Sequence, residues 1–511
     1  MLAGCMIGPD FSPPPAPLAD QWSDSSNASV DTSRQEYREW WNVFDDPLLA
    51  SLIETAYRQN LTLRMAGVRV LQARAQLGLA IGELYPQEQQ VGGSLSYNRI
   101  PVSIPYNVIN NMYWQTLLGA QVGWEIDFWG KVRRAIQSAD NAYLASVAEY
   151  DDILVTLTGD VASAYVQIRT LEARIAIAEE NIEKQQIALR IARNRFHGGV
   201  VTKRDVYQAE NVLGSTEAAI PALTIELAQA KNALSVLLGA PPGGLDETLA
   251  GPAPIPVAPA QVAVAIPAEL LRRRPDIRQA ELDAAAQCAQ IGVAKADLLP
   301  AFSLLGNIGT FASDIGRHEL TDLFTMKSLD YSVGPAVQWN ILNYGQITNN
   351  VRVQDARFQE LLVNYQSTVL NAQQEVENGI VLFVQSRQQS AFLAESVAAA
   401  EGALRIAMNQ YKEGTADFTT VLLAEQDLYK AQDNLAVAQG NIPLGLIAAY
   451  RALGGGWQIR EGEEFVPQDT RDEMAARTNW GTLLTPELLT PQAPGLPGPE
   501  DTGPTVRPPE W

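Results

Sequence analysis

The chain contains two copies of one long unit, and this repetition constrains its fold more than any other feature. The segment from Arg195 to Glu210 can be laid on the segment from Gln410 to Glu425, 215 positions later. The same offset joins Gly130 to Gly345, Gly199 to Gly414 and Leu238-Gly239 to Leu453-Gly454, while Pro86 falls on Pro300 one position short of it. Solenoid repeats are much shorter than this unit. The sequence therefore predicts a duplicated domain.

Each copy is expected to hold a helical hairpin of unusual length. No proline lies between Gly130 and Pro221 or between Gly345 and Pro443. At ~1.5 Å per residue, helices over 131–196 and 346–412 would each be roughly 100 Å long. Glycine turns end both rods, and returning helices are expected near 202–238 and 417–453. Shorter helices near 60–84 and 275–299 open the copies and would stack end to end on the returning helices.

Alternating apolar and polar residues predict strands between these helices. From Trp114 to Phe128 the even positions are mostly apolar and the odd positions mostly polar, and 329–341 repeats the pattern. Weaker partner strands run through 91–98 and 301–309. Such strands, with tryptophans near their ends, suit a lipid-facing barrel with a watery lumen, although a soluble sandwich alternates in the same way. Four strands cannot close a barrel, so we expect the barrel to be shared between chains.

Composition argues against several other classes of protein. The formal charge of −21 would repel a nucleic-acid backbone. Two histidines and two cysteines, far apart in sequence, give no metal site or disulfide framework. No apolar run is long enough for a membrane-spanning helix. The acidic pairs Asp151-Asp152 and Glu179-Glu180 are interpreted as solvated helix faces and Arg272–Arg274 as a solvated turn. We predict no catalytic residues, no metal and no cofactor, and therefore not an enzyme.

The chain begins MLAGC, and Leu2-Ala3-Gly4-Cys5 resembles a bacterial lipoprotein cleavage box. In such a box, a signal peptide is removed before the cysteine, whose thiol takes a covalent lipid, and palmitate is typical of such anchors. We therefore predict lipidation at Cys5, the alternative being a free thiol in a frayed terminus. The proline-rich stretch that follows cannot be helical and is expected to be an extended tether.

These patterns divide the chain as follows. We predict a tether at 5–40, a first repeat at 41–239 with a β-hairpin at 88–128 and a helical hairpin at 131–238, a linker at 240–266, a second repeat at 267–457 with a β-hairpin at 301–341 and a helical hairpin at 346–453, and a tail at 458–511. The tail is rich in proline and is expected to be disordered beyond about 481.

Taken together, the chain resembles the TolC-like outer-membrane factors of tripartite efflux and type I secretion, in the lipoprotein branch similar to OprM and NodT. The resemblance rests on LAGC with GPDF, WWNVFDDPLLASLI, WEIDFWGKVRR, LLRRRPDIRQAE, WNILNYGQI and the two glycine turns. It implies an α+β fold: a trimeric outer-membrane β-barrel, with four strands per chain and twelve in all, continued by a long periplasmic α-helical barrel. It also implies a passive exit duct whose partners are a periplasmic adaptor, an inner-membrane pump and outer-membrane lipid.

The resemblance further implies a gate at the periplasmic tip. Asp205 and Tyr411 match positions of an interhelical lock, and Asp417 and Leu423 lie beside the second turn. Leu423 stands where relatives often carry an aspartate, and Ala416 where they can carry an arginine, so Asp417, Glu425 or Asp427 would have to supply charge there. Read without the family, Asp205 is a charge in a first helical turn and Tyr411 a packed aromatic residue.

The glycine turns around Gly198, Gly199, Gly414 and Thr415 are expected to dock the adaptor, because they lie as far from the strands as the chain can reach. A different class of protein, a lipid-anchored periplasmic coiled-coil adaptor or scaffold, would also contain the long helices. It would have no use for four alternating strands. The exported substrate is left open by the sequence.

Overall fold

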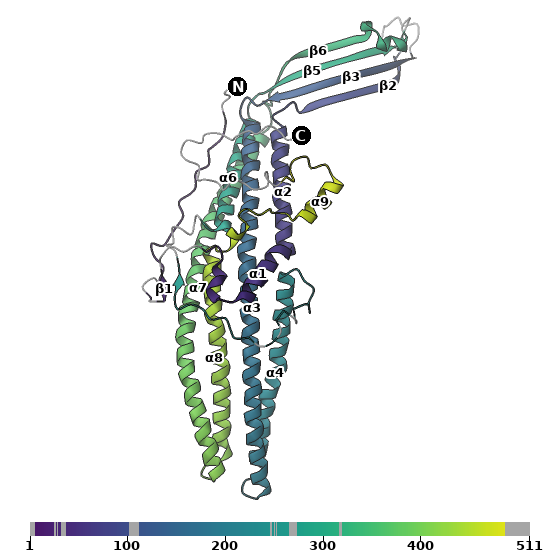
Figure 1. The fold of residues 1–511 in the computed structure, drawn as a ribbon. Coiled ribbons are helices and arrows are strands. Elements are labelled where there is room, and N and C mark those ends of the chain that lie inside the picture. The colour runs from purple at the N-terminus through teal and green to yellow at the C-terminus, as the bar shows by residue number, and fades with distance from the viewer. Residues whose placement is uncertain are drawn as a thin grey trace.

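The computed structural model describes residues 6–24, 27, 29–31, 37–101, 112–245, 248–249, 251, 253–264, 273–315 and 319–485. Long helices run side by side toward one end of the molecule, and a four-stranded sheet projects from the other end (Figure 1). The chain therefore has the expected α+β fold with an internal duplication.

Each repeat contains one long helix and two shorter ones. The long helices are α3 (Lys131–His197) and α7 (Gln346–Glu413), the returning helices are α4 (Lys203–Leu237) and α8 (Phe418–Ala452), and the opening helices are α2 (Leu61–Gly82) and α6 (Pro275–Ala296). The returning helices continue through Pro221 and Pro443. Figure 1 shows α2 above α4 and α6 above α8, so two short helices accompany each long one. Outside this pattern lie α1 (Pro47–Gln59) and α9 (Gln468–Arg477).

In each repeat, the short opening helix meets the end of the returning helix below it, and we call this meeting point a joint. The two joints are closed by equivalent contacts of different chemistry. In the first repeat, the Asn60 amide donates to the Leu237 carbonyl at 2.8 Å. In the second, the Arg274 guanidinium donates to the Ala452 carbonyl at 2.7 Å. Arg274 is buried and also pairs with Asp276 on α6 and Glu375 on α7. The interpretation of Arg272–Arg274 as a solvated turn is therefore wrong for Arg274, because its guanidinium supplies a donor to a carbonyl at the buried end of α8 that has no helical partner. Arg272 lies outside the described residues.

Glycines let the helices of the second repeat approach closely. A Cβ atom at Gly379 on α7 would lie 2.6 Å from the Ala449 nitrogen on α8. A Cβ atom at Gly445 on α8 would lie 2.5 Å from the Phe383 nitrogen on α7. Real Cβ atoms do not come this near to backbone, so the two helices are in contact through their main chains at these points.

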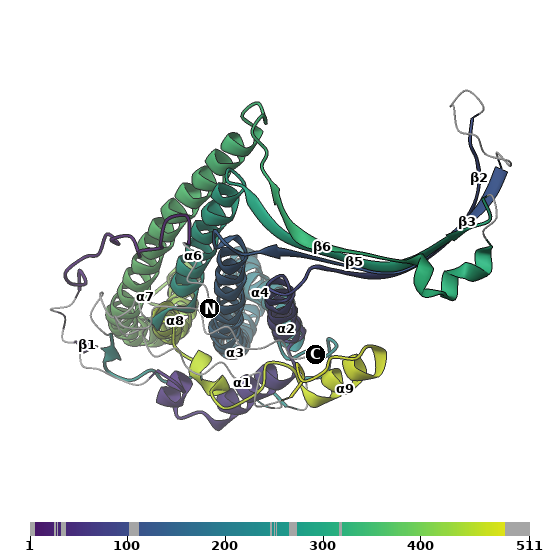
Figure 2. The ribbon, with the colours of Figure 1, turned by 90° about the horizontal axis from the view of Figure 1, so that it is seen from above.

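The strands form one antiparallel sheet in the order β2-β3-β5-β6. They are β2 (Glu88–Arg99), β3 (Met112–Ile126), β5 (Ala301–Ser313) and β6 (Leu329–Gln338). Seen from above, the sheet curves strongly away from the helices (Figure 2). One face is polar, with hydrogen bonds from Gln121 to Gln90 and from Ser332 to Asn307. The other face exposes apolar side chains, among them Val91, Tyr331 and Val333.

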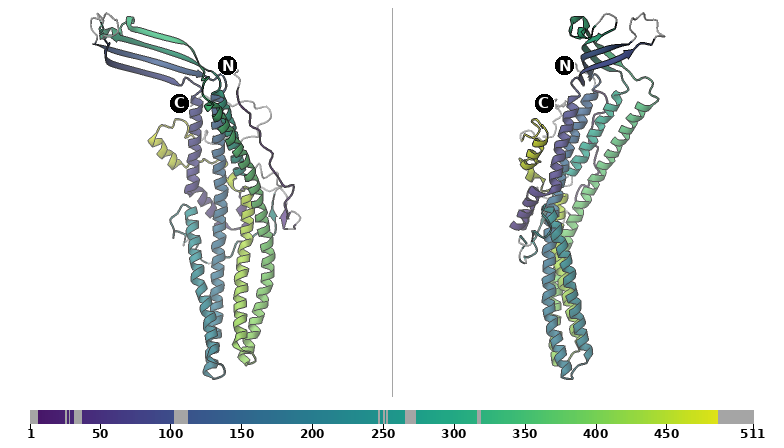
Figure 3. Two further views of the ribbon diagram at one scale, coloured as in Figure 1. Left: turned by 180° about the vertical axis from the view of Figure 1, so that it is seen from behind. Right: turned by 90° about the vertical axis from the view of Figure 1, so that its right-hand side faces the viewer.

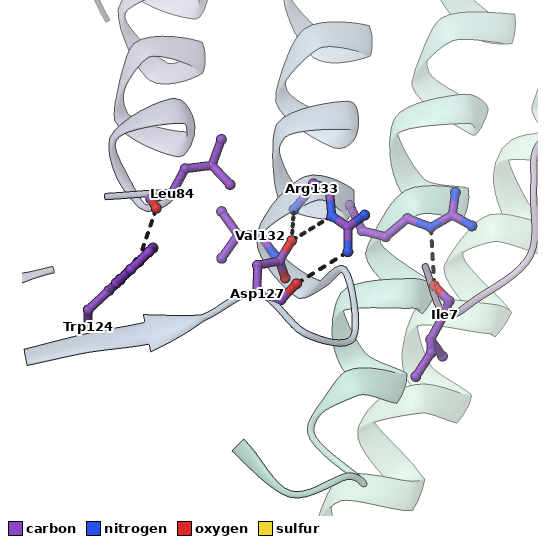
Figure 4. A network of polar contacts seen from close by, with 7 residues as sticks. Ile7, Leu84, Trp124, Asp127, Val132 and Arg133 are labelled. Atoms are coloured by element: carbon purple, nitrogen blue, oxygen red, sulfur yellow. Dashed lines mark hydrogen bonds and ion pairs between the residues drawn. The ribbon is translucent and has the colours of Figure 1, made fainter. Parts of the chain in front are cut away.

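Strands β3 and β6 end before the expected limits at Phe128 and Ile341, because the chain turns into the long helices there. Asp127 accepts hydrogen bonds from the backbone nitrogens of Val132 and Arg133, at 2.9 and 3.2 Å, and from the Arg133 side chain (Figure 4). These bonds satisfy nitrogens at the start of α3 that have no helical partner. Nearby, the Trp124 indole donates to the Leu84 carbonyl at 3.1 Å, which ties the strand to the end of α2.

The N-terminal segment, expected to be an extended tether, is extended and is packed against the helices. Arg134 donates to the Ile7 carbonyl at 3.1 Å and pairs with Asp10 at 2.8 Å. Further along, the Ala19 nitrogen donates to Gln373 on α7. The extended course over α6 and α7 is visible in Figure 3. The short strand β1 (Val30–Asp31) then pairs in parallel with β4 (Val262–Ala263), so part of the expected linker at 240–266 is strand.

The tail folds back onto the middle of the molecule. Phe465 and Val466 belong to the main hydrophobic core. Arg460 makes a two-pronged ion pair with Asp151, which is buried, so the interpretation of Asp151 as a solvated face is wrong. The acidic side chain is held inside because the returning tail supplies its arginine partner. Residues 481–485 are described and form a turn, whereas the disorder expected further along falls on 486–511, outside the described residues.

Candidate functional site at the tip of the helical hairpins

The two helical hairpins turn at matching glycines. Gly199 has φ +70° and Gly414 has φ +78°, the left-handed conformation that glycine adopts without strain. In both turns the residue after the glycine donates back across the turn, from Val200 to Arg195 and from Thr415 to Gln410, which ends each helix in the same way. Gly198 is helical, so only Gly199 needs glycine for its backbone. The four predicted docking residues thus lie in two exposed turns.

Asp205 and Tyr411 come together between the hairpins. Tyr411 is 1% exposed and packs against Phe418, Val206 and Val421 in a small apolar cluster. Burial raises the pKa of the Tyr411 hydroxyl, and the neighbouring Asp205 charge raises it further. The hydroxyl has no hydrogen-bond partner among the described residues, while the Thr202 hydroxyl donates to Asp205 at 3.3 Å. Asp205 and Tyr411 therefore lie close together, but no direct hydrogen bond between them is present among the described residues.

Arg195 makes the contact between the hairpins that the sequence reasoning missed. Its guanidinium carbon, from the end of α3, lies 4.6 Å from the centre of the Tyr411 ring at the end of α7. A cation over an aromatic face is attractive, and more so when water is excluded. The sequence offers one signal for this contact: the two repeats differ here, because Gln410 occupies the position in the second repeat that matches Arg195. A glutamine offers no cation, so within the described residues the second repeat has no matching contact.

Asp417 and Leu423 do not join this cluster. The exposed Asp417 caps α8 by accepting from the Thr420 nitrogen at 3.3 Å. Leu423 is exposed on α8. Among the described residues, neither side chain hydrogen-bonds to Asp205 or Tyr411, and neither belongs to the apolar cluster around Tyr411. Both residues lie beside the second turn, as expected, and their part in a gate stays a prediction.

Glu425 is the unusual carboxyl group of the tip. It is 3% exposed, and among the described residues its Oε1 atom has no hydrogen-bond partner. Burial alone raises the pKa of this carboxyl from its usual 4.5 to about 7. Its repeat counterpart, Glu210, pairs with Arg193 at 2.8 Å. The residue that matches Arg193 in the second repeat is Met408, so Glu425 has lost the partner that the duplication would provide.

A shallow groove of about 420 Å³ opens over Glu425. Residues from three helices line it: Lys184 and Ile187 on α3, Glu401, Leu404, Arg405 and Met408 on α7, and Glu425 and Leu428 on α8. The charged groups that face Glu425 are therefore Lys184, Glu401 and Arg405.

Two further features concern membranes and metals. Among the helices in the described ranges, none is both long and apolar enough to cross a bilayer. Likewise, the described residues contain no group of three or more histidine, cysteine, aspartate or glutamate side chains placed to hold a metal ion. Cys5 lies outside the described residues, and Met6, the first described residue, packs against Gly130 at the start of α3.

Comparison with known proteins matches both repeats of the chain. Residues 52–240 and 266–455 fit the family model described as outer membrane efflux protein. Nodulation protein T of Rhizobium leguminosarum bv. trifolii is 30% identical over 442 residues, which cover 86% of this chain and 91% of that protein. Cation efflux system protein CusC of Escherichia coli O6:H1 is 30% identical over 459 residues, which cover 89% of this chain and 97% of that protein.

A solved structure of an outer-membrane channel shares the fold of this chain. The solved structure of the outer-membrane channel OprN superposes on this chain with a TM-score of 0.81 and 31% sequence identity. The superposition covers 89% of this chain and 100% of that one. The long helices, the projecting sheet and the duplication are thus shared over nearly the whole length of the molecule.

Proposed function

Because this chain belongs to the outer membrane efflux protein family, we propose that it is the outer-membrane channel of a tripartite efflux system and works as a passive exit duct. The observation that carries this function is the join between a curved sheet and a bundle of roughly 100 Å helices. A duct from the outer membrane into the periplasm needs both parts in one continuous structure. The sheet supplies the passage through lipid, and the helices extend it into the periplasm.

The working unit in this proposal is a homotrimer. The sheet curves but has only four strands, and open strand edges are not tolerated in lipid. Its polar face, with Gln90, Gln121 and Asn307, would line the lumen, and the face bearing Val91 and Val333 would meet lipid. Three copies would contribute twelve strands to one closed barrel.

The tip would dock a periplasmic adaptor that carries an inner-membrane pump. The turns at Gly199 and Gly414 lie at the far end of the helices from the sheet, and both are exposed. A partner from the inner membrane would therefore meet them first. The buried contacts behind the turns, Arg195 on Tyr411 and Asp205 beside it, would hold the two hairpins together in the closed state.

Lipid attachment at Cys5 completes the proposal. Ile7 is bonded to Arg134 and to the Trp129 carbonyl, where the sheet meets the helices. A lipid on Cys5 would start two residues before this contact, close to the outer-membrane end of the molecule. Mass spectrometry of protein expressed with a full leader tests it, because an unmodified Cys5 that still carries upstream residues would refute the attachment.

Planar bilayer recording tests the channel and its gate together. The wild-type protein should insert and conduct weakly. The double variant Asp205→Ala with Tyr411→Leu, which removes the acidic group and the ring beneath Arg195, should conduct more because the hairpins are freed to splay. The matched control is Glu179→Gln, on an exposed face of α3 away from the turns, which should leave the conductance unchanged. A coiled-coil scaffold would give no conductance in either form. A double variant that remains as closed as the wild type would move the gate away from this pair.

A further inference from the structure

Glu425 is a buried carboxyl group, and the groove of about 420 Å³ between α3, α7 and α8 opens over it. Only 3% of the residue is exposed, and among the described residues its Oε1 atom accepts no hydrogen bond. A buried polar group without a partner lowers stability, and more so when it is charged. A hydrogen-bond donor that entered this groove would therefore supply what the carboxyl group lacks.

The first repeat shows which donor suits this carboxyl group. Glu210 lies 215 positions before Glu425 and accepts a bond from the Arg193 guanidinium at 2.8 Å. That pair is on the surface, with the two side chains 40% and 54% exposed. In the second repeat, Met408 takes the place of Arg193 and lines the groove. The second repeat thus keeps the carboxyl group, buries it more deeply and lacks the guanidinium.

The other charged groups around the groove nearly balance one another. Lys184 on α3 already pairs with Glu180 at 2.8 Å. Arg405 and Glu401, both exposed on α7, have opposite charges. The carboxylate of Glu425, when ionised, is therefore the one charge that these neighbours leave uncompensated. The groove has room in its charge balance for a single positive group.

Apolar side chains make up the rest of the groove. They are Ile187 on α3, Leu404 and Met408 on α7, and Leu428 on α8. Sites for small molecules typically have volumes of about 300–1,000 Å³ and combine apolar walls with a few polar groups that fix the ligand. Long basic side chains use the same combination, because their carbon stems lie on apolar surface while the charged end meets a polar partner.

We propose that this groove binds a small organic cation, a guanidinium or ammonium group on a short apolar stem, which donates a hydrogen bond to Glu425. The charged group takes the place that Arg193 has beside Glu210 in the first repeat, and the stem lies on Leu404 and Met408. The site goes beyond the proposed channel and does not depend on it. Because α3 belongs to one hairpin and α7 and α8 to the other, the bound cation contacts both hairpins and favours the arrangement in which they lie together.

Isothermal titration of the intact, detergent-solubilised protein with butylguanidinium tests the site. At about pH 8 the carboxyl group of Glu425 is ionised, because burial raises its pKa to about 7. Butylurea has nearly the same shape without the charge, and it should bind at least about tenfold more weakly because charge-assisted hydrogen bonds are the strong ones. The guanidinium ion, which has the charge without the stem, should also bind several-fold more weakly. Below about pH 7 the affinity for butylguanidinium should fall by about tenfold per unit of pH.

Two variants should lose the binding site in different ways. Glu425→Gln removes the anionic partner. Met408→Arg keeps Glu425 but supplies a guanidinium from within the chain, so that the ligand is displaced. Each should lower the affinity for butylguanidinium by at least about tenfold. The matched controls are Met408→Leu, which keeps an apolar wall, and Glu210→Gln in the first repeat, and both should bind within about twofold of the wild type.

The proposal is supported if the protein prefers butylguanidinium to butylurea and if this preference disappears in Glu425→Gln and in Met408→Arg but not in the controls. It is overturned if butylurea binds as tightly as butylguanidinium, because the groove would then be an apolar surface only. It is also overturned if Glu425→Gln binds like the wild type. If the wild type takes up no cation at all, the groove is covered by another chain or stays empty, and the proposal fails. Binding without conductance in planar bilayers would count against the channel and leave the site standing.

Discussion

Asn60 and Arg274 hold matching places in the two repeats and close the same joint with different groups. The Asn60 amide and the Arg274 guanidinium each donate to the carbonyl at the end of the returning helix below. Asn60 also caps α2 by accepting from the Leu63 nitrogen at 2.9 Å. Arg274 adds ion pairs to Asp276 and Glu375. The first joint is thus neutral and the second is charged.

Removing either group should destabilise the protein. Asn60→Ala loses a helix cap worth about 1 kcal/mol and a hydrogen bond worth about 1 kcal/mol. Arg274→Met loses charge-assisted bonds worth roughly 1.5–3 kcal/mol, the lower end being expected because Glu375 is half exposed. Thermal unfolding followed by circular dichroism measures both. Arg58→Ala breaks an exposed pair with Glu54 and should change the stability by less than ~0.5 kcal/mol. Equal effects from all three variants would argue against the joints.

Replacing Arg195 by the residue at its repeat counterpart should loosen the tip. Arg195→Gln keeps polarity but removes the cation from the Tyr411 ring, a loss of about 1–2 kcal/mol for a contact that is partly shielded from water. We expect a higher open probability in planar bilayers with no change in trimer stability. Arg193→Gln, which breaks an exposed pair with Glu210, is the matched control. If both variants conduct alike, the stacking on Tyr411 does not hold the gate.

Alanine should be tolerated unequally at the two turn glycines. Both positions have positive φ, so each substitution costs about 1–2 kcal/mol of backbone strain. A Cβ atom at Gly199 meets no described atom within 4 Å, whereas one at Gly414 lies 3.3 Å from a guanidinium nitrogen of Arg195. Gly414→Ala should therefore also displace Arg195 and raise conductance, while Gly199→Ala should not. Conductance recorded on matched preparations decides between them, and an identical rise in both variants would contradict the prediction.

Glu425 should make the closed tip sensitive to pH. Burial raises the pKa of this carboxyl in the closed tip to about 7, and hydration in an open tip would return it toward 4.5. Because the raised pKa favours the protonated form, the closed tip is fully stable below about pH 4.5, loses stability as the pH rises to about 7, and changes little above that. The loss is at most about 3 kcal/mol.

Hydrogen exchange at the end of α7, measured across this range of pH, reports the effect. Glu425→Gln should remove the pH dependence and leave the tip closed throughout. Met408→Arg, which restores the arginine that Glu210 has in the first repeat, should lower the pKa of Glu425 and flatten the profile in the same range. Glu210→Gln is the control and should behave like the wild type. A pH profile that survives Glu425→Gln would assign the titration to another group.

The regular parts of this fold could be predicted from sequence because each leaves a local signal. The proline-free runs predicted α3 and α7, and the alternation from Trp114 predicted β3, since one helix or strand contains all the residues that produce its period. Contacts between distant segments leave no such signal. Asp151 is buried only because Arg460 folds back 309 positions later, and Arg274 only because α8 ends beside it.

The candidate site shows the same division. The glycine turns follow from residues that adjoin them in sequence, and the family resemblance brought Asp205 and Tyr411 into view. The contact of Arg195 with Tyr411 and the isolation of Glu425 depend on how two hairpins pack, which neither composition nor spacing records. Comparison of the repeats position by position would have flagged both, because Arg193 becomes Met408 and Arg195 becomes Gln410.

The main-chain contacts at Gly379 and Gly445 determine how far the tip can travel. About 34 residues of α7 lie beyond Gly379, a lever arm of roughly 50 Å. If the hairpin pivots where the two backbones touch, a rotation of about 10° there displaces the turn at Gly414 by roughly 9 Å, with little repacking near the fulcrum. A small torque applied at the far end would thus be enough to change the bore of the duct, and a side chain added at either glycine would shift the pivot itself.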